Sequence, residues 1–203
     1  MSPGDPVIVR AYRTPQGKED GVFADVRSED LSIPLIDYVL EDTGLVADAI
    51  DDLMWGVAQQ RSEQGSNLAR VIALLSDLGE SVPAATINRW CASSMQAIMS
   101  AADAIAAGNR EAIIAGGVEN MSRVPMGENT VNVHPRMNEV YNVAELQMGM
   151  TAEKVAEEFD ITREMQDEYA AKSQQRAAEA TESGRFDDEI VPIETEAGLI
   201  EED

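Results

Sequence analysis

The sequence of 203 residues holds one cysteine, one histidine and three lysines, and it has no long apolar run. A single cysteine cannot form an internal disulfide. A membrane-spanning helix needs about 20 consecutive apolar residues, so no span is predicted. The first ten residues lack the basic and apolar regions of a signal peptide. We therefore expect a cytoplasmic protein.

Basic side chains are also scarce, with 15 against 38 acidic ones and a net charge of −23. The negative electrostatic field of such a protein repels nucleic acid phosphates and anionic membranes, so neither partner is expected. An acidic surface poor in lysine suits a cytoplasm of very high salt, where the Debye length falls to about 3 Å at 1 M. The composition favours a halophilic source over an ordinary acidic protein.

Strand and helix patterns alternate through the first half of the chain. The expected strands are residues 7–9, 53–57, 85–88 and 112–115, and the expected helices are residues 31–40, 67–78 and 93–107. Gly44, Gly79 and Gly108 follow these helices, as C-terminal caps often do. The alternation predicts an α/β fold with a mainly parallel sheet between helices.

The pattern changes after residue 118. Residues 119–147 show little periodicity and predict a long loop. Two helices are expected at residues 152–159 and 163–183, with Thr151 and Thr162 as N-caps, and one more strand at residues 190–193. We therefore divide the chain into an α/β core over residues 1–118 and a largely helical segment over residues 119–203.

The single cysteine, Cys91, stands where a short apolar run meets an alanine-rich helix. A thiol attacks as the thiolate, which the N-terminus of a helix favours by up to ~2 kcal/mol. That effect leaves an ordinary thiol only partly ionised, so a base must complete the activation. The one histidine, His134, lies in an irregular segment before Pro135, a poor platform for a catalytic group. A small buried cysteine without a chemical role is the alternative.

Six short motifs occur along the chain in one order. NRWCASSMQA at residues 88–97 closely resembles the nucleophile motif of the thiolases, and AGGVENMSRVP at residues 115–125 resembles their second signature. The other matches are VIVRAYRTPQGK at 7–18, EQGSNLAR at 63–70, MGMTAEKVA at 148–156 and FDDEIVP at 186–192. By these motifs the chain resembles the thiolase family of 3-ketoacyl-CoA thiolases and acetyl-CoA acyltransferases.

The resemblance implies an N-terminal α/β half followed by an incomplete loop domain, with a related C-terminal catalytic half absent. It implies that Cys91 takes the acyl group of a 3-ketoacyl-CoA as a thioester, with its backbone N–H as an oxyanion donor, and that the reverse reaction is a Claisen condensation. Coenzyme A is the implied co-substrate, without a permanently bound cofactor or metal. The family's activating histidine and second cysteine belong to the absent half, so this chain alone is expected to be inactive.

Three other positions carry over from the family as substrate-binding residues. Met126 and Met148 are expected to line the acyl pocket, and Gln147 stands where many biosynthetic thiolases have histidine, which favours a degradative enzyme. The resemblance also implies a homodimer or tetramer, or a complementary C-terminal chain. Two alternatives stay open: a non-catalytic thiolase-like half that serves as a scaffold or assembly partner, and another condensing enzyme such as a ketoacyl synthase.

Overall fold

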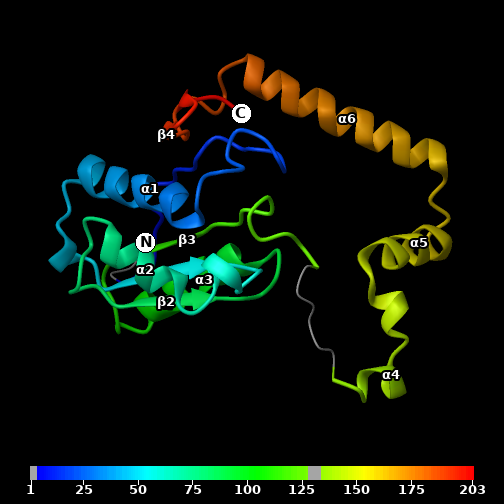
Figure 1. Ribbon diagram of the computed structural model, residues 1–203, viewed down its shortest axis with the longest axis horizontal. Coiled ribbons are helices and arrows are strands. Elements are labelled where there is room, and N and C mark those ends of the chain that lie inside the picture. The colour runs from blue at the N-terminus through cyan, green and yellow to red at the C-terminus, as the bar shows by residue number, and fades with distance from the viewer. Residues whose placement is uncertain (1–3, 128–133) are drawn as a thin grey trace. The chain divides into compact units, whose positions relative to one another are not determined.

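A computed structural model describes residues 4–127 and 134–203 and divides the chain into two compact units (Figure 1). One unit comprises Met1–Glu128 with Glu189–Asp203, and the other comprises Asn129–Asp188. The predicted division at residue 118 differs from this one in two ways, since the first unit continues to residue 128 and residues 189–203 return to it. The N–H of Arg13 donates to the Glu189 carbonyl at 2.8 Å, which holds the returning segment.

Three parallel strands form the sheet of the first unit. They are β1 (Asp52–Gly56), β2 (Ala84–Ile87) and β3 (Ile113–Gly117), in the order β2-β1-β3. Helix α2 (Leu68–Leu75) joins β1 to β2, and α3 (Ser93–Ala106) joins β2 to β3. The sequence located all five elements to within three residues at each end, and the parallel sheet is confirmed.

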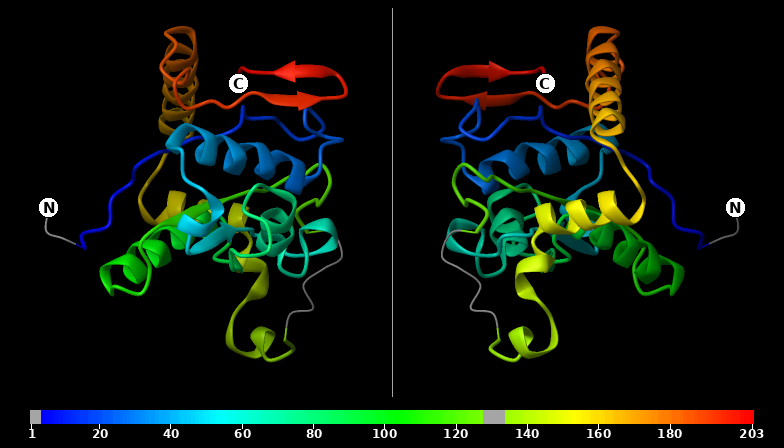
Figure 2. Two further views of the ribbon diagram at one scale, coloured as in Figure 1. Left: turned by 90° about the vertical axis from the view of Figure 1, so that its left-hand side faces the viewer. Right: turned by 90° about the vertical axis from the view of Figure 1, so that its right-hand side faces the viewer.

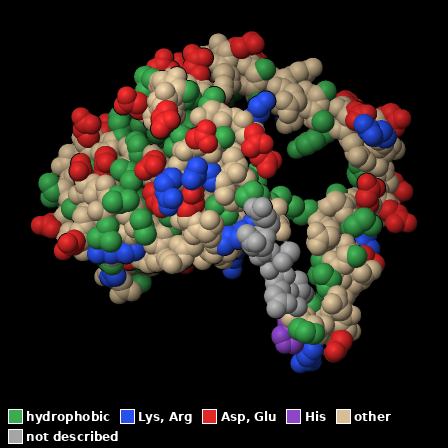
Figure 3. Space-filling view, in the orientation of Figure 1, with side chains coloured by type: hydrophobic (Ala, Val, Ile, Leu, Met, Phe, Trp, Pro, Cys, Tyr) green, Lys and Arg blue, Asp and Glu red, His purple; other side chains and the backbone are tan. Residues whose placement is uncertain are grey.

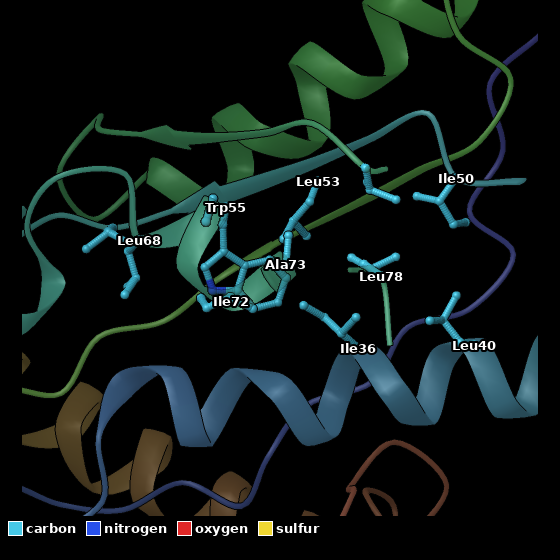
Figure 4. Close-up of a cluster of buried hydrophobic side chains, with 12 residues drawn as sticks. Ile36, Leu40, Ile50, Leu53, Trp55, Leu68, Ile72, Ala73 and Leu78 are labelled. Atoms are coloured by element: carbon cyan, nitrogen blue, oxygen red, sulfur yellow. The ribbon is translucent and has the colours of Figure 1, made fainter. Parts of the chain in front are cut away.

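The helices cover opposite faces of this sheet because the side chains of β1 alternate in direction. Leu53 and Trp55 point into a core shared with α2 and with α1 (Ser28–Thr43), which packs on α2 (Figure 4). The Trp55 indole N–H donates to Ser32 Oγ at 3.2 Å. Gly56 faces the other way and meets the start of α3. Helix α3 therefore lies on the face opposite α1 and α2.

Residues 7–9 do not form the strand predicted for them. Val7, Ile8 and Val9 are 53%, 75% and 66% exposed. A strand needs a neighbour for its N–H and C=O groups, and within the described ranges no strand pairs with this stretch. These residues are apolar, as in a strand, but the neighbouring strand that they would need is not among the described elements.

The C-terminal segment forms a hairpin of β4 (Ile193–Thr195) and β5 (Gly198–Ile200), which lies beside the N-terminal segment (Figure 2). The strand predicted at residues 190–193 is therefore misplaced, since Ile190 makes only an isolated bridge to Arg13. The Arg13 guanidinium bonds Asp203 at 2.6 Å, and this contact holds the pKa of the Asp203 carboxyl below its usual value. An ion pair thus reinforces the backbone pairing.

The second unit contains α4 (Met137–Val140), α5 (Met148–Glu158) and α6 (Arg163–Glu182). Helix α6 begins as predicted, with Thr162 Oγ1 accepting the N–H of Met165 at 3.3 Å. Helix α5 begins four residues before the predicted start, so Gln147 takes the N-cap position and Thr151 lies within the first turn. Helix α4 interrupts the predicted loop, of which residues 128–133 lie outside the described part.

Short 3-10 turns complete the secondary structure at Ala47–Ala49, Ser62–Gln64 and Val143–Leu146. No helix in the described part of the chain is long and apolar enough to cross a membrane.

Acidic side chains are distributed over the face seen in Figure 3 rather than gathered in one patch. Because their mutual repulsion is screened by salt, we expect the melting temperature to rise from low to multimolar potassium chloride. Circular dichroism melts would measure it, with choline chloride at equal ionic strength to separate screening from a potassium-specific effect. A melting temperature that falls with salt would contradict the halophilic interpretation.

Candidate active site

Cys91 lies in the tight turn that connects β2 to α3. Strand β2 ends at Ile87 and α3 begins at Ser93, so five residues reverse the chain. Trp90, directly before the cysteine, has φ of 51°, a left-handed conformation that costs a non-glycine residue about 1 kcal/mol or more. Such strain persists only where the surroundings hold it. Cys91 is a free and exposed thiol.

Two side chains hold this turn in place. The buried Ser93 Oγ accepts the N–H of Arg89 at 2.9 Å and donates to the Trp90 carbonyl at 2.5 Å. The Asn88 Oδ1 accepts the N–H of Trp90 at 2.9 Å, while its Nδ2 donates to the Ala58 carbonyl at 2.9 Å. The backbone on both sides of the strained residue is therefore fixed by hydrogen bonds.

Two glycines let the start of α3 rest directly on the sheet. A Cβ at Gly56 would lie 2.4 Å from the backbone of Ser93 and Ser94. A Cβ at Gly117 would lie 2.2 Å from Ser94 Oγ and 2.4 Å from the backbone oxygen of Gly56, which cannot rotate away. Since real contacts are never this short, both positions require glycine. Strands β1 and β3 therefore determine how closely the start of α3, which directly follows the Cys91 turn, packs on the sheet.

A polar cluster follows the same edge of the sheet. The Glu119 carboxylate, just after β3, accepts the N–H of Ala58 at 2.8 Å and the Nε2 of Gln64 at 2.5 Å. Gln64 is fully buried, and its Oε1 accepts from Ser28 Oγ at 2.7 Å and from the N–H of Asn120 at 2.9 Å. Sequence analysis missed this cluster, although Gln64, Glu119 and Asn120 all lie within its quoted motifs.

An ion pair joins this region to the loop before α2. The Arg123 guanidinium bonds Glu63 at 2.7 Å, and Arg27 lies 3.3 Å from the same carboxylate. The hydrogen bond from Arg123, and to a smaller extent the charge of Arg27, hold the pKa of the Glu63 carboxyl below its usual value. Arg123 therefore ties the segment after Glu119 to the loop before α2.

The other predicted site residues fall in different places. Met126 belongs to the first unit and is 59% exposed, while Gln147 and Met148 are exposed at the start of α5 in the second unit. Their part in an acyl pocket stays a prediction. His134 is exposed and its Nδ1 accepts the N–H of Arg136 at 3.2 Å. Among the described residues, no group of three or more His, Cys, Asp and Glu side chains could hold a metal ion.

The fold and the turn together define an α/β protein that presents one exposed thiol at the start of a helix resting on a parallel sheet. Residues 6–200 match the family model described as the thiolase N-terminal domain. The chain belongs to the thiolase family. The resemblance read from the six motifs is confirmed.

The chain is similar to curated 3-ketoacyl-CoA thiolases. That of Escherichia coli O1:K1 / APEC is 48% identical over 188 residues, which cover 92% of this chain and 48% of the relative, and the same figures hold for that of Serratia proteamaculans (strain 568). The chain thus spans about half the length of these relatives. It also resembles the crystal structure of the Bacillus anthracis acetyl-CoA acetyltransferase, with a TM-score of 0.80 and 37% identity over 97% of this chain and 53% of that one.

Proposed function

We propose that this chain is the nucleophile-bearing half of an acyl-CoA acyltransferase of the thiolase type. The observation that carries the proposal is the position of Cys91, exposed on a strained and hydrogen-bonded turn at the start of α3. A cysteine kept only for packing would be buried. Membership of the thiolase family and the names of the relatives support the same activity.

In this proposal the Cys91 thiolate attacks the 3-keto carbon of a 3-ketoacyl-CoA. The bond between C2 and C3 breaks, the acetyl-CoA carbanion takes a proton and leaves, and the shortened acyl group stays on sulfur as a thioester. The thiol of coenzyme A then attacks this thioester and carries the acyl group away. The reverse sequence is a Claisen condensation, and coenzyme A is a co-substrate rather than a bound cofactor. Covalent catalysis of this kind divides one difficult cleavage into two acyl transfers.

The backbone N–H of Cys91 is the proposed oxyanion donor. Among the described residues it has no hydrogen-bond partner, whereas the N–H groups of Ala92 and Ser93 bond to the carbonyls of Arg89 and Trp90. A free donor beside the reacting sulfur can stabilise the negative oxygen of each tetrahedral intermediate. The helix start adds a favourable dipole.

The base that activates Cys91 is assigned to a C-terminal half. Met95 and Met99 of helix α3 are 61% and 50% exposed. They form an apolar surface next to the nucleophile, which suggests that another polypeptide covers it. We propose that this half supplies the base that activates Cys91, and that assembled subunits form a homodimer or tetramer. Met126, Gln147 and Met148 are proposed to line the acyl site of a degradative enzyme.

The decisive experiment is acylation by acetyl-CoA, with and without a C-terminal half added as a second polypeptide. We expect a mass increase of one acetyl group on the peptide containing Cys91 only when both parts are present, because in this proposal the C-terminal half supplies the base. Tryptic mapping by mass spectrometry gives the position. If the combined polypeptides carry no thioester, the enzymatic proposal fails and the non-catalytic scaffold becomes the better account.

A further inference from the structure

A chain of hydrogen bonds begins at the buried side chain of Gln64 in the first unit. Gln64 has all of its side-chain polar atoms engaged, since its Nε2 also donates to the Gln59 carbonyl at 3.1 Å. Glu119 is exposed but is bonded to this buried amide at 2.5 Å. The carboxylate of Glu119 is therefore fixed to the core rather than free in solvent.

The next link is the peptide that follows β1. Glu119 accepts the N–H of Ala58 at 2.8 Å and the N–H of Gln59 at 3.3 Å. The Gln59 N–H shares one planar peptide unit with the Ala58 carbonyl, so Glu119 also orients this carbonyl oxygen, which accepts the Nδ2 of Asn88 at 2.9 Å. The segment after β3 is thus connected, through the segment after β1, to the side chain of Asn88.

The last link reaches the nucleophile turn. The Oδ1 of Asn88 accepts the N–H of Trp90 at 2.9 Å, and Trp90 holds the strained φ of 51°. The backbone of Trp90 sets the direction of both the N–H and the Cα–Cβ bond of Cys91, which follows it. From this geometry we propose that Asn88 is a positioning residue for Cys91, with Glu119 and Gln64 holding Asn88 in turn. The inference rests on the proposed function, because it concerns the orientation of the thiol that accepts the acyl group.

Burial does not explain Asn88, since the residue is exposed and its side chain makes the two hydrogen bonds described above. Its function is instead to favour one conformation of the turn over the relaxed alternatives that Trp90 would otherwise adopt. Ser93 holds the other side of Trp90, so the turn keeps its fold without Asn88 but loses a defined orientation. A small misplacement of a reacting group costs up to about 100-fold in rate.

The variants Asn88→Ala and Asn88→Ser test this role, with Asn67→Ala as the matched control. Asn67 also bonds to β2, donating to the Ala84 carbonyl at 2.9 Å and accepting from Thr86 Oγ1 at 2.8 Å. It also caps α2 by accepting the N–H of Arg70 at 3.4 Å, and all of these partners lie outside the nucleophile turn. Serine at position 88 can still accept the N–H two residues later. It therefore retains the bond to Trp90 and loses the bond to Ala58.

Two rates are measured, each in the chain combined with a C-terminal half. One is acyl transfer, as kcat and KM, and the other is alkylation of Cys91 by iodoacetamide at pH 7, mapped by mass spectrometry. We expect kcat to fall by on the order of tenfold in Asn88→Ala with KM unchanged, a smaller loss in Asn88→Ser, and wild-type kcat in Asn67→Ala. The alkylation rate of Cys91 should change in the same order.

Equal rates in the alanine variants at positions 88 and 67, or an undiminished kcat in Asn88→Ala, would overturn the positioning role. If Asn88→Ala does not fold, Asn88→Ser decides, because wild-type rates there would show that the bond from Asn88 to Ala58 has no effect on Cys91. The failures are distinguishable. A wild-type protein without acylation but with alkylation that depends on Asn88 would refute the proposed function and leave the positioning role intact.

Discussion

Replacing Cys91 with alanine or serine is expected to abolish acyl transfer, with a loss of about 10⁴-fold or more, as removal of a catalytic nucleophile does in other covalent enzymes. Alanine has no attacking atom. Serine keeps the shape, but its hydroxyl stays protonated at neutral pH and is a far weaker nucleophile than a thiolate. The measurement is single-turnover formation of the thioester from labelled acetyl-CoA by the chain combined with a C-terminal half.

Stability provides the control for this experiment. Because the Cys91 side chain is exposed, both variants should melt within a few degrees of the wild-type protein, as surface substitutions usually do. Ser94→Ala, in the first turn of α3, is the matched variant that alters a neighbouring side chain and keeps the thiol. Acyl transfer that survived in Cys91→Ala would place the nucleophile elsewhere and contradict the proposed mechanism.

The local pattern of the sequence predicted the elements that depend on their own residues. Helix α1 and helix α6 were located because an apolar stripe or a capping threonine marks them directly, and Gly44 ends α1 with φ of 68°. The three strands of the sheet were located because each is a short apolar run bounded by turn residues. Cys91 was predicted to stand at the start of a helix, and its place directly before α3 is confirmed, while its role as nucleophile stays a prediction.

The features that the sequence did not reveal depend on partners distant along the chain. Residues 7–9 have the composition of a strand, but a strand also requires a neighbour. The hairpin at the C-terminus was misplaced because the Arg13 bridge fixes Ile190 outside it. The cluster around Glu119 could not be predicted, since a buried Gln64 looks in sequence like any polar loop residue. Its partners come from 55 and 56 positions away.

The second large effect is expected at Gly56, where substitution by alanine should lower the free energy of unfolding by about 3 kcal/mol, near the upper end for overpacking. The added Cβ would lie 2.4 Å from the backbone of Ser93 and Ser94. A backbone cannot rotate away as a flexible side chain does, so the start of α3 must move outward. The φ of Gly56 is outside the left-handed region, and the penalty therefore comes from this contact alone.

A displacement of α3 would also lower the reactivity of Cys91. The same shift would move Cys91 and weaken the hydrogen bonds that Ser93 makes to the turn. Chemical denaturation gives the stability loss, and the alkylation rate of Cys91 under native conditions gives the functional loss. Gly149→Ala in α5 is the control, since nothing lies within 4 Å of a Cβ there and alanine favours a helix. If Gly56→Ala were as stable and as reactive as Gly149→Ala, the start of α3 could not rest on β1 as closely as described. The sheet would then not set the position of the nucleophile.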